Sequence, residues 1–319
     1  MTPNQRKGLP LRHVEEAILK TVLYADIFSF ALTFDELHHF LIAETPVSRF
    51  ELECTLAGSA FLRNYIECQP PYLVRAGRTD LIEVRRQRED ATDRLWPQAL
   101  RYGRWLSRLP FVRMVALTGA VAMRNAAHER DDIDYVLVTH VGRVWLARAF
   151  AILLVRAARW RGIALCPNYV MAESALEQKR RDLYIAHEVA QMVPLYGLEL
   201  YELLRVHNGW VFNFMPHAYG SYHQADECAL GAPWKQIKKS LEWLLGGRLG
   251  AAFERWEYAR KRRRFAHEME ARQRAGPHAA HIDEEQVKGH FDDHGHPILR
   301  AYFERLRQCQ LDALSMAGD

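Results

Sequence analysis

The feature that most constrains the fold is the stretch Met114–Thr139, in which two apolar runs flank a glycine turn and a pair of aspartates. The spacing predicts a strand, a tight turn, a short helix, a loop and a second strand that opens with Asp132-Ile133-Asp134. Successive side chains of a strand point to opposite faces, so Asp132 and Asp134 lie on the same face. Two carboxylates placed in this way predict a site for Mg²⁺, which prefers oxygen ligands and leaves positions open for phosphate oxygens.

The turn that precedes the aspartates consists of Thr118, Gly119 and Ala120, where the first strand ends and a helix begins. A glycine lets a phosphate approach the backbone, and N–H groups at the start of a helix favour an anion. Arg124 and Asn125 follow on this helix and could reach the same phosphates, although a solvated helix face explains them equally well. A phosphate cradle beside metal-binding carboxylates is typical of metal-assisted phosphoryl or nucleotidyl transfer.

These residues resemble the signature of the polymerase-β-like nucleotidyltransferase superfamily, in which a hydrophobic strand is followed by Gly-Ser or Gly-Gly and then by Asp-hydrophobic-Asp. Gly119 matches the glycine, and Asp132 and Asp134 match the acids. Most of the chain also resembles a bacterial group of nucleotidyltransferase-domain proteins with an N-terminal winged-helix-like segment. The segments that carry this wider resemblance are Leu165–Val170, Ala186–Gly197, Asn208–Pro216 and Val287–His294.

The resemblance implies Mg²⁺-dependent transfer of a nucleoside monophosphate from an NTP to a hydroxyl group of a protein, an RNA or a small molecule. Asp132 and Asp134 are then the catalytic metal ligands. The residues predicted to bind the nucleotide are Thr118, Gly119, Ala120, Arg124 and Asn168.

Two positions depart from the superfamily pattern. Ala120 stands where members usually carry a serine whose hydroxyl helps to hold the phosphates, and Thr118 is a candidate to supply that hydroxyl instead. The strand predicted over Ile163–Met171, which we match to the strand with a third carboxylate, offers Asn168 and no acid. Asn168 is either a weak ligand or a polar core residue. These departures support an alternative, a nucleotidyltransferase-fold protein that has lost catalysis and binds a nucleotide or a partner.

Net charge, cysteine spacing and the apolar stretches bear on which class of protein this is. The 319 residues carry a formal net charge of +4, which permits nucleotide or nucleic-acid binding without indicating it. The five cysteines are scattered without a CxxC pair, which favours a reducing cytoplasm over a disulfide scaffold or a zinc ribbon. No signal peptide is apparent, and the most apolar stretch, Val144–Val155, is too short and too charged to span a bilayer. We therefore expect a cytoplasmic protein without a membrane partner.

The first 85 residues predict three helices followed by a two-stranded wing, which is the order of a winged-helix domain. The helices are expected at Arg12–Ala25, Phe34–Ile42 and Ser48–Arg63, and the strands at Tyr72–Val74 and Leu81–Val84. Thr33 and Glu36 form a capping box before the second helix. The third helix, which would read DNA, carries Glu51 and Glu53 and few basic residues. This charge pattern disfavours DNA binding and favours an interaction or scaffold domain.

The whole chain predicts an α+β protein that is mostly helical. Residues 86–110 form a linker helix, 111–175 a nucleotidyltransferase-fold core with a mixed β-sheet and flanking helices, and 176–319 an α-helical region that closes over the site. In the core, strands at Val112–Leu117, Ile133–Val138 and Ile163–Met171 alternate with helices at Ala120–His128 and Arg143–Arg159. Later helices are expected at Glu177–Val193, Leu198–His207, Trp234–Leu245, Gly250–Arg272 and Pro297–Ala313.

Three further groups of residues have two interpretations each. Arg181 and His187 could contact a nucleotide, but surface salt pairs and a packed histidine are the simpler explanation. His290 and His294 have the spacing of zinc ligands on a helix, although nearby aspartates and a glycine disfavour a helix there, and a lid over the site is a further interpretation. The basic run at 260–264 is typical of a solvated helix that pairs with its own glutamates, with a patch that binds a nucleotide or RNA as the alternative.

Overall fold

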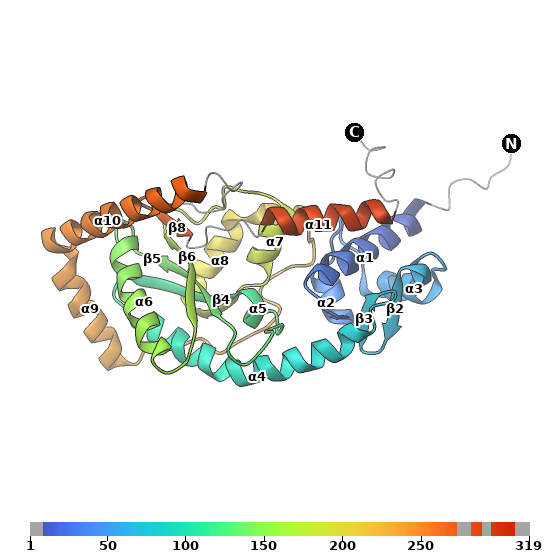
Figure 1. Cartoon of the computed structure of the whole chain (residues 1–319), viewed down its shortest axis with the longest axis horizontal. Helices are drawn as coiled ribbons and strands as arrows, with labels where there is room; N and C mark the ends of the chain where they lie inside the picture. Colours follow the sequence, from blue (N-terminus) through green and yellow to red (C-terminus); the bar gives the residue numbers. More distant parts are fainter. Residues whose placement is uncertain (1–8, 273–281, 289–294, 310–319) are drawn as a thin grey trace.

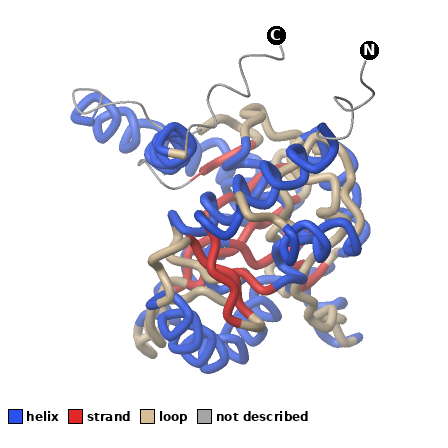
Figure 2. Tube along the Cα trace, turned by 90° about the vertical axis from the view of Figure 1, so that its right-hand side faces the viewer, coloured by secondary structure: helices blue, strands red, loops and turns tan. Residues whose placement is uncertain are grey.

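The computed structural model describes residues 9–272, 282–288 and 295–309. It confirms an α+β protein that is mostly helical, with a three-stranded sheet near the N-terminus and a five-stranded sheet in the larger half (Figure 1). Figure 2 shows that helices lie on both sides of the strands. Within the described ranges, no helix combines the length and the apolar character needed to cross a membrane.

The N-terminal region combines three helices with the small antiparallel sheet. Its elements are α1 (Leu9–Ile27), β1 (Leu32–Thr33), α2 (Phe34–His39), α3 (Arg49–Gly58), the 3-10 helix η1 (Leu62–Asn64), β2 (Ile66–Gln69) and β3 (Tyr72–Arg75). The predicted capping box is confirmed, because the Thr33 hydroxyl accepts the N–H of Glu36 and the Glu36 carboxylate accepts the N–H of Thr33. Ser48 and Glu51 form a second capping box at the start of α3.

The predicted strand at Leu81–Val84 is wrong, because these residues begin the helix α4 (Asp80–Ser107). The short apolar run looks like a strand locally, but Leu81, Ile82 and Arg85 are buried along one side of an amphipathic helix. The strand that pairs with β3 on this side is β2, which precedes it. α3 also ends earlier than predicted, at Gly58, because glycine weakens a helix.

The helix α4 connects the two halves of the molecule. In Figure 1 it runs along the lower edge of the fold, from the small sheet to the large one. Leu95, Ala99, Tyr102 and Leu106 belong to its buried stripe and pack on the larger sheet. α4 corresponds to the linker helix predicted for residues 86–110, but it begins earlier, at Asp80.

The five-stranded sheet is mixed and has the strand order β7-β4-β5-β6-β8. Its strands are β4 (Val112–Thr118), β5 (Ile133–Thr139), β6 (Leu165–Ala172), β7 (Val193–Tyr196) and β8 (Gln286–Lys288). β4 and β5 are antiparallel, with Thr118 opposite Asp134. β5 and β6 are parallel, with Asp134 opposite Cys166. The glycine turn after Thr118 therefore lies beside the start of β5.

Helices cover both faces of this sheet. The described helices that follow β4 are α5 (Gly119–Ala122), α6 (Val144–Arg159), α7 (Leu183–Ala190), α8 (Leu198–His207), the 3-10 helix η2 (Gly209–Asn213), α9 (Ala232–Gly246), α10 (Arg248–Arg272) and α11 (Gly295–Gln308). α4 and α6 pack on the face that carries Tyr135 and Leu137 of β5. α7 and α8 pack on the opposite face with Val136 and Val138. Because side chains alternate along a strand, Asp134 belongs to the α7 face.

Two predicted helices in this half are wrong in extent. The helix expected at Ala120–His128 is only the short α5, because Arg124 adopts a positive φ of 55° and the chain leaves the helix. The helix expected at Glu177–Val193 is the shorter α7, and the chain then forms β7 at the edge of the sheet. The region after residue 175 is therefore not wholly helical, since it adds β7 and β8 to the sheet.

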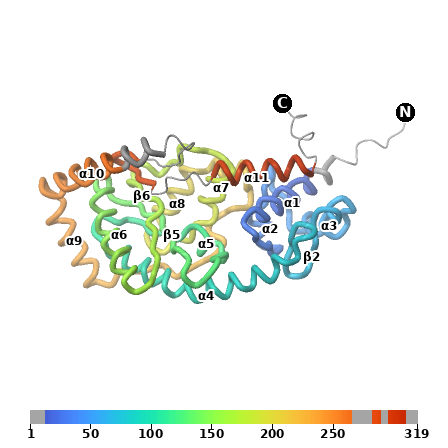
Figure 3. The backbone as a smooth tube through the Cα atoms, in the orientation of Figure 1, coloured from blue at the N-terminus to red at the C-terminus, as the bar shows by residue number. Residues whose placement is uncertain are grey.

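The helices α11 and α1 pack together although they come from opposite ends of the sequence (Figure 3). Tyr302 and Leu306 of α11 join the core of the N-terminal region, and Arg305 pairs with the buried Asp26 of α1 at 2.8 Å. α11 also contacts α7. The N-terminal region is thereby held against the helix that covers the Asp134 face of the sheet.

Candidate functional site

Gly119 lies directly against the carboxylate of Asp134. Its φ of 67° is in the left-handed region, which favours glycine. A Cβ atom added at Gly119 would lie 2.5 Å from Oδ2 of Asp134, so no side chain fits there without displacing the carboxylate. The structure therefore brings together the glycine turn and one of the two predicted metal-binding acids.

The two aspartates have different environments. Asp132 is exposed, whereas Asp134 is half-buried. The pKa of Asp134 is raised to about 7, mainly by burial and then by the negative charge of Glu188, against a hydrogen bond from the Cys166 thiol that lowers it. Asp132 raises the pKa further. Asp134 therefore sits in a region of negative potential, which favours a bound cation.

Glu188 supplies a third carboxylate near Asp134, and the sequence analysis missed it. Gln191, one turn later, donates a hydrogen bond of 2.7 Å to Glu188 and lies 3.5 Å from the hydroxyl of Thr118. Asp182, six residues before Glu188, caps the start of α7 by accepting the N–H of Ile185. One sequence feature could have identified Glu188. It is a glutamate in a mostly apolar helix, and such a helix is expected to pack on the sheet.

The acids of the site fit a hard cation. Asp134 near the start of β5 and Asp132 in the loop just before this strand offer oxygen ligands, and Glu188 adds negative charge near Asp134. Among the residues that the structure describes, no group of three or more His, Cys, Asp or Glu side chains is arranged to bind a metal ion. A Mg²⁺ ion on Asp132 and Asp134 would therefore take its remaining ligands from phosphate oxygens and water.

Cys166, and not Asn168, is the residue of β6 that faces Asp134. The register between β5 and β6 shifts between Tyr135 and Val136, which leaves Asn168 in a bulge. The side-chain oxygen of Asn168 is buried and has no hydrogen-bond partner among the described residues. The thiol of Cys166 donates to Asp134, and burial raises the pKa of this thiol. A third carboxylate on β6 would thus stand where this cysteine is.

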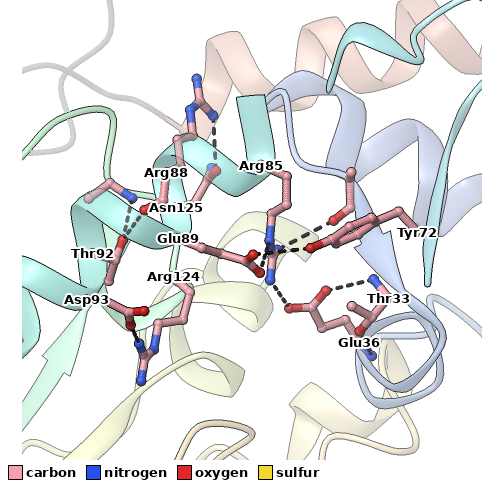
Figure 4. Close-up of polar contacts among 12 residues, drawn as sticks. Thr33, Glu36, Tyr72, Arg85, Arg88, Glu89, Thr92, Asp93, Arg124 and Asn125 are labelled. Carbon is pink, nitrogen blue, oxygen red and sulfur yellow. Dashed lines mark hydrogen bonds and ion pairs between the residues drawn. The ribbon is translucent and has the colours of Figure 1, made fainter. Parts of the chain in front are cut away.

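The predicted phosphate ligand Arg124 points toward α4. Its guanidinium pairs with Asp93 and lies 4.2 Å from the ring centre of Trp96. The next residue, Asn125, accepts a hydrogen bond of 3.0 Å from Arg88 (Figure 4). The loop that follows α5 is therefore anchored to α4, and the Arg124 guanidinium already has a carboxylate partner.

A cavity of about 400 Å³ opens at the glycine turn. Gly119 and Ala120 form one side of it, and Glu188 and Gln191 of α7 form another. α1, the segment at 28–32 and α11 supply the remaining wall, so the cavity lies between the N-terminal region and the larger half. Thr118, the third residue of the turn, is buried. The backbone of the turn and the polar side chains of α7 thus meet at a space large enough for a small molecule.

Other predicted candidates lie outside this cluster or have structural partners. Arg181 pairs with Glu177. His187 lines the cavity as a packed ring, 4.0 Å from the ring centre of Tyr24, and burial lowers its pKa to about 3. In the basic run, Arg260 pairs with Glu257 of the same helix. The predicted zinc ligands at 290 and 294 lie outside the described residues.

The chain matches no protein-family model, no curated protein and no solved structure. Three separate elements thus contribute to this cluster: Gly119 of α5 and Glu188 of α7 line the cavity, and Asp134 of β5 lies against Gly119, outside the cavity lining.

Proposed function

We propose that the protein is a Mg²⁺-dependent nucleotidyltransferase, which moves a nucleoside monophosphate from an NTP to a hydroxyl group of an acceptor. The contact between Gly119 and Asp134 is the observation that supports this most, because it places a glycine turn, which lets a phosphate approach the backbone, directly beside a carboxylate, which is a ligand that Mg²⁺ prefers. The larger half then corresponds to a nucleotidyltransferase-fold core. The N-terminal helices and the β2–β3 hairpin correspond to a winged-helix-like domain.

Each residue of the cluster has a role in this proposal. The backbone at Gly119 and Ala120 lets the phosphates approach, and Asp132 and Asp134 hold the cation. When bound, Mg²⁺ neutralises the charge of the phosphates. The acceptor oxygen forms a bond to the α-phosphorus, and the bond from this phosphorus to the bridging oxygen breaks, so pyrophosphate leaves with the electron pair. Glu188 is placed to take the proton from the acceptor hydroxyl.

The winged-helix-like domain is proposed to serve in interactions and not in DNA binding. Its third helix, α3, exposes Glu51 and Glu53. The basic residue at its start, Arg49, pairs with Asp35 of α2. A face with this charge repels the phosphates of a DNA backbone.

Calorimetric titration with each of the four NTPs, with and without Mg²⁺, tests the proposed site. The wild type should bind at least one NTP only in the presence of Mg²⁺. The double variant Asp132→Ala/Asp134→Ala should lose this binding, because the cation loses both of its protein ligands. The control is Glu53→Ala/Asp90→Ala, which removes two exposed carboxylates from α3 and α4 and should bind as the wild type does. Equal binding by both double variants would exclude the proposed metal site.

One observation favours a second function, a nucleotidyltransferase-fold protein without catalysis that binds a nucleotide or a partner. Cys166 faces Asp134 where a third carboxylate would stand, and a buried thiol is a poor ligand for Mg²⁺. In that case an NTP would bind with Mg²⁺, but pyrophosphate release would stay at the background rate. Cys166→Asp would then be the variant in which release is expected to rise.

A further inference from the structure

The cavity at the glycine turn has mainly apolar walls, which both halves of the molecule supply and which include several aromatic rings. Its aromatic lining residues are Tyr24, Phe28, Phe30, Phe40 and Tyr184. Tyr24 is packed against the ring of His187, and Phe40 lies parallel to the same ring at 6.1 Å. Such walls bind the apolar body of a small molecule, but they offer few hydrogen bonds to replace the water around a strongly hydrated molecule.

The polar groups of the cavity are few and gather near the turn. The hydroxyl of Thr21 donates to the carbonyl of Ala17 and accepts the N–H of Ile42, so its hydrogen bonds are already made within the protein. The hydroxyl of Tyr24 differs: the residue is only 4% exposed, and this oxygen has no hydrogen-bond partner among the described residues. A buried hydroxyl without a partner is unfavourable, and a ligand group in the cavity would satisfy it.

The charges around the cavity exclude an anionic occupant. Glu188 lines it, Asp134 lies behind Gly119, and none of the described lining residues is a lysine or an arginine. The negative charge of Glu188 acts on both Tyr24 and Asp134 and raises the pKa of each, after burial. The triphosphate of an NTP is therefore expected on the outer side of the Gly119–Ala120 turn, toward the exposed Asp132, and not inside the cavity. A hydroxyl or an ammonium group, which donates hydrogen bonds, suits the carboxylate end.

We propose that this cavity is the acceptor pocket and that the acceptor is an uncharged or cationic small molecule with an apolar body and a hydroxyl group. This inference rests on the proposed nucleotidyl transfer. A volume of about 400 Å³ admits a small molecule and not a folded protein or an RNA strand, which selects one of the three acceptor classes. The acceptor oxygen bonds to the α-phosphorus, pyrophosphate leaves, and the hydroxyl proton passes to Glu188.

Three probes that share a phenol and differ in charge test the pocket: 4-ethylphenol, tyramine and 4-hydroxyphenylacetate. Each is titrated into the full chain by calorimetry, without NTP or Mg²⁺. The neutral and cationic probes should bind, and the anionic probe should bind at least tenfold more weakly. Equal or tighter binding of the anion, or no binding of any probe, would overturn the proposal.

Two conservative variants show where the probes bind. Tyr24→Phe should weaken the binding of 4-ethylphenol by about three- to tenfold, because one hydrogen bond is lost. Glu188→Gln should remove any preference for tyramine over 4-ethylphenol. Tyr219→Phe, at an exposed tyrosine outside the cavity, is the control and should bind as the wild type does. Probe binding unchanged in both cavity variants would also overturn the proposal.

The same titrations separate this inference from the proposed function. If an NTP binds with Mg²⁺ and no probe binds, the acceptor pocket is wrong and the metal site stands. If the probes bind with the expected charge preference and no NTP binds, the ligand class of the cavity stands, and its role as an acceptor pocket fails together with the proposed function.

Discussion

Arg85 and Glu36 form an ion pair of 2.8 Å inside the protein, where 2% and 1% of their surfaces are exposed. Arg85 also pairs with Glu89 at 2.7 Å and lies 4.0 Å from the ring centre of Phe30 (Figure 4). The pair joins α4 to α2 and so links the N-terminal region to the helix that supports the larger sheet. The N-terminal region lines part of the cavity, and this ion pair helps to hold that region in position.

We expect Glu36→Ala to lower the free energy of unfolding by about 3–5 kcal/mol, because the buried guanidinium loses its main partner. The variant also loses the capping box of α2. Urea denaturation followed by circular dichroism measures the loss. Glu51→Ala is the control, since it removes the matching capping box of the exposed α3, at a cost of about 1 kcal/mol. A similar loss in both variants would show that the buried pair contributes little.

Gly119→Ala should reduce both stability and NTP binding. A positive φ alone costs an alanine about 1–2 kcal/mol, and the new Cβ would in addition displace the Asp134 carboxylate. Gly142→Ala is the matched control, because Gly142 has a φ of 66° and no atom within 4 Å of the added Cβ. Thermal unfolding and calorimetry on both variants separate the backbone cost from the clash. If Gly142→Ala lost as much NTP binding as Gly119→Ala, the contact between Gly119 and Asp134 would not be needed for NTP binding.

The stability of the fold should fall as the pH falls from about 6.5 toward 4. Burial, followed by the charge of Arg205, lowers the pKa of His39 to about 4, and its Nε2 is buried without a partner among the described residues. The unfolded chain binds a proton near pH 6.5, so acid favours unfolding within this window. His39→Gln should reduce the acid-induced loss in the free energy of unfolding by about 1–3 kcal/mol. The measurement is urea denaturation across this pH range.

The control for this pH effect is His128→Gln, at an exposed histidine of the loop after α5. Its stability should follow the wild-type pH profile. A His39→Gln profile parallel to that of the wild type would mean that His39 is not among the groups that make the fold acid-sensitive.

Lys238→Met should destabilise the contact between α9 and the rest of the protein. The ammonium group of Lys238 is buried and donates to the carbonyls of Ser107 (2.8 Å) and Val112 (2.5 Å). A methionine fills the space but leaves these carbonyls without their donor, at a cost of about 1–3 kcal/mol. Lys239→Met, at the exposed neighbour, should cost less than about 0.5 kcal/mol. Differential scanning calorimetry of the two variants gives the comparison, and equal melting temperatures would refute the anchoring role.

Local sequence patterns were sufficient for the central motif and for several helices. The two apolar runs predicted β4 and β5, and the capping residues Thr33 and Glu36 predicted the start of α2. The helix α8 occupies its predicted range, Leu198–His207. These features depend on residues within a few positions of one another, which is why the chain in isolation shows them.

Features that depend on pairing between distant segments were missed. The register of the parallel β5–β6 ladder pairs Cys166 with Asp134, and the bulge that follows this pair leaves Asn168 without a partner residue on β5. β7 was not predicted, because its pairing with β4 is not encoded in its own short run of residues. Leu81 and Ile82 favour a strand locally, but burial along α4 makes them helical.

The sequence by itself determined the glycine turn, the apolar strands on either side of it and the mostly helical α+β character, because each follows from residues close together in the chain. The predicted strand opening at Asp132 is wrong by one residue, because β5 begins at Ile133 and Asp132 lies in the loop before it. Only the tertiary structure decided that Glu188 stands beside Asp134, that Arg124 turns to Asp93, and that α1, α7 and α11 enclose a mainly apolar cavity over the turn. These contacts depend on how helices pack over the sheet, and that packing is a property of the whole folded chain.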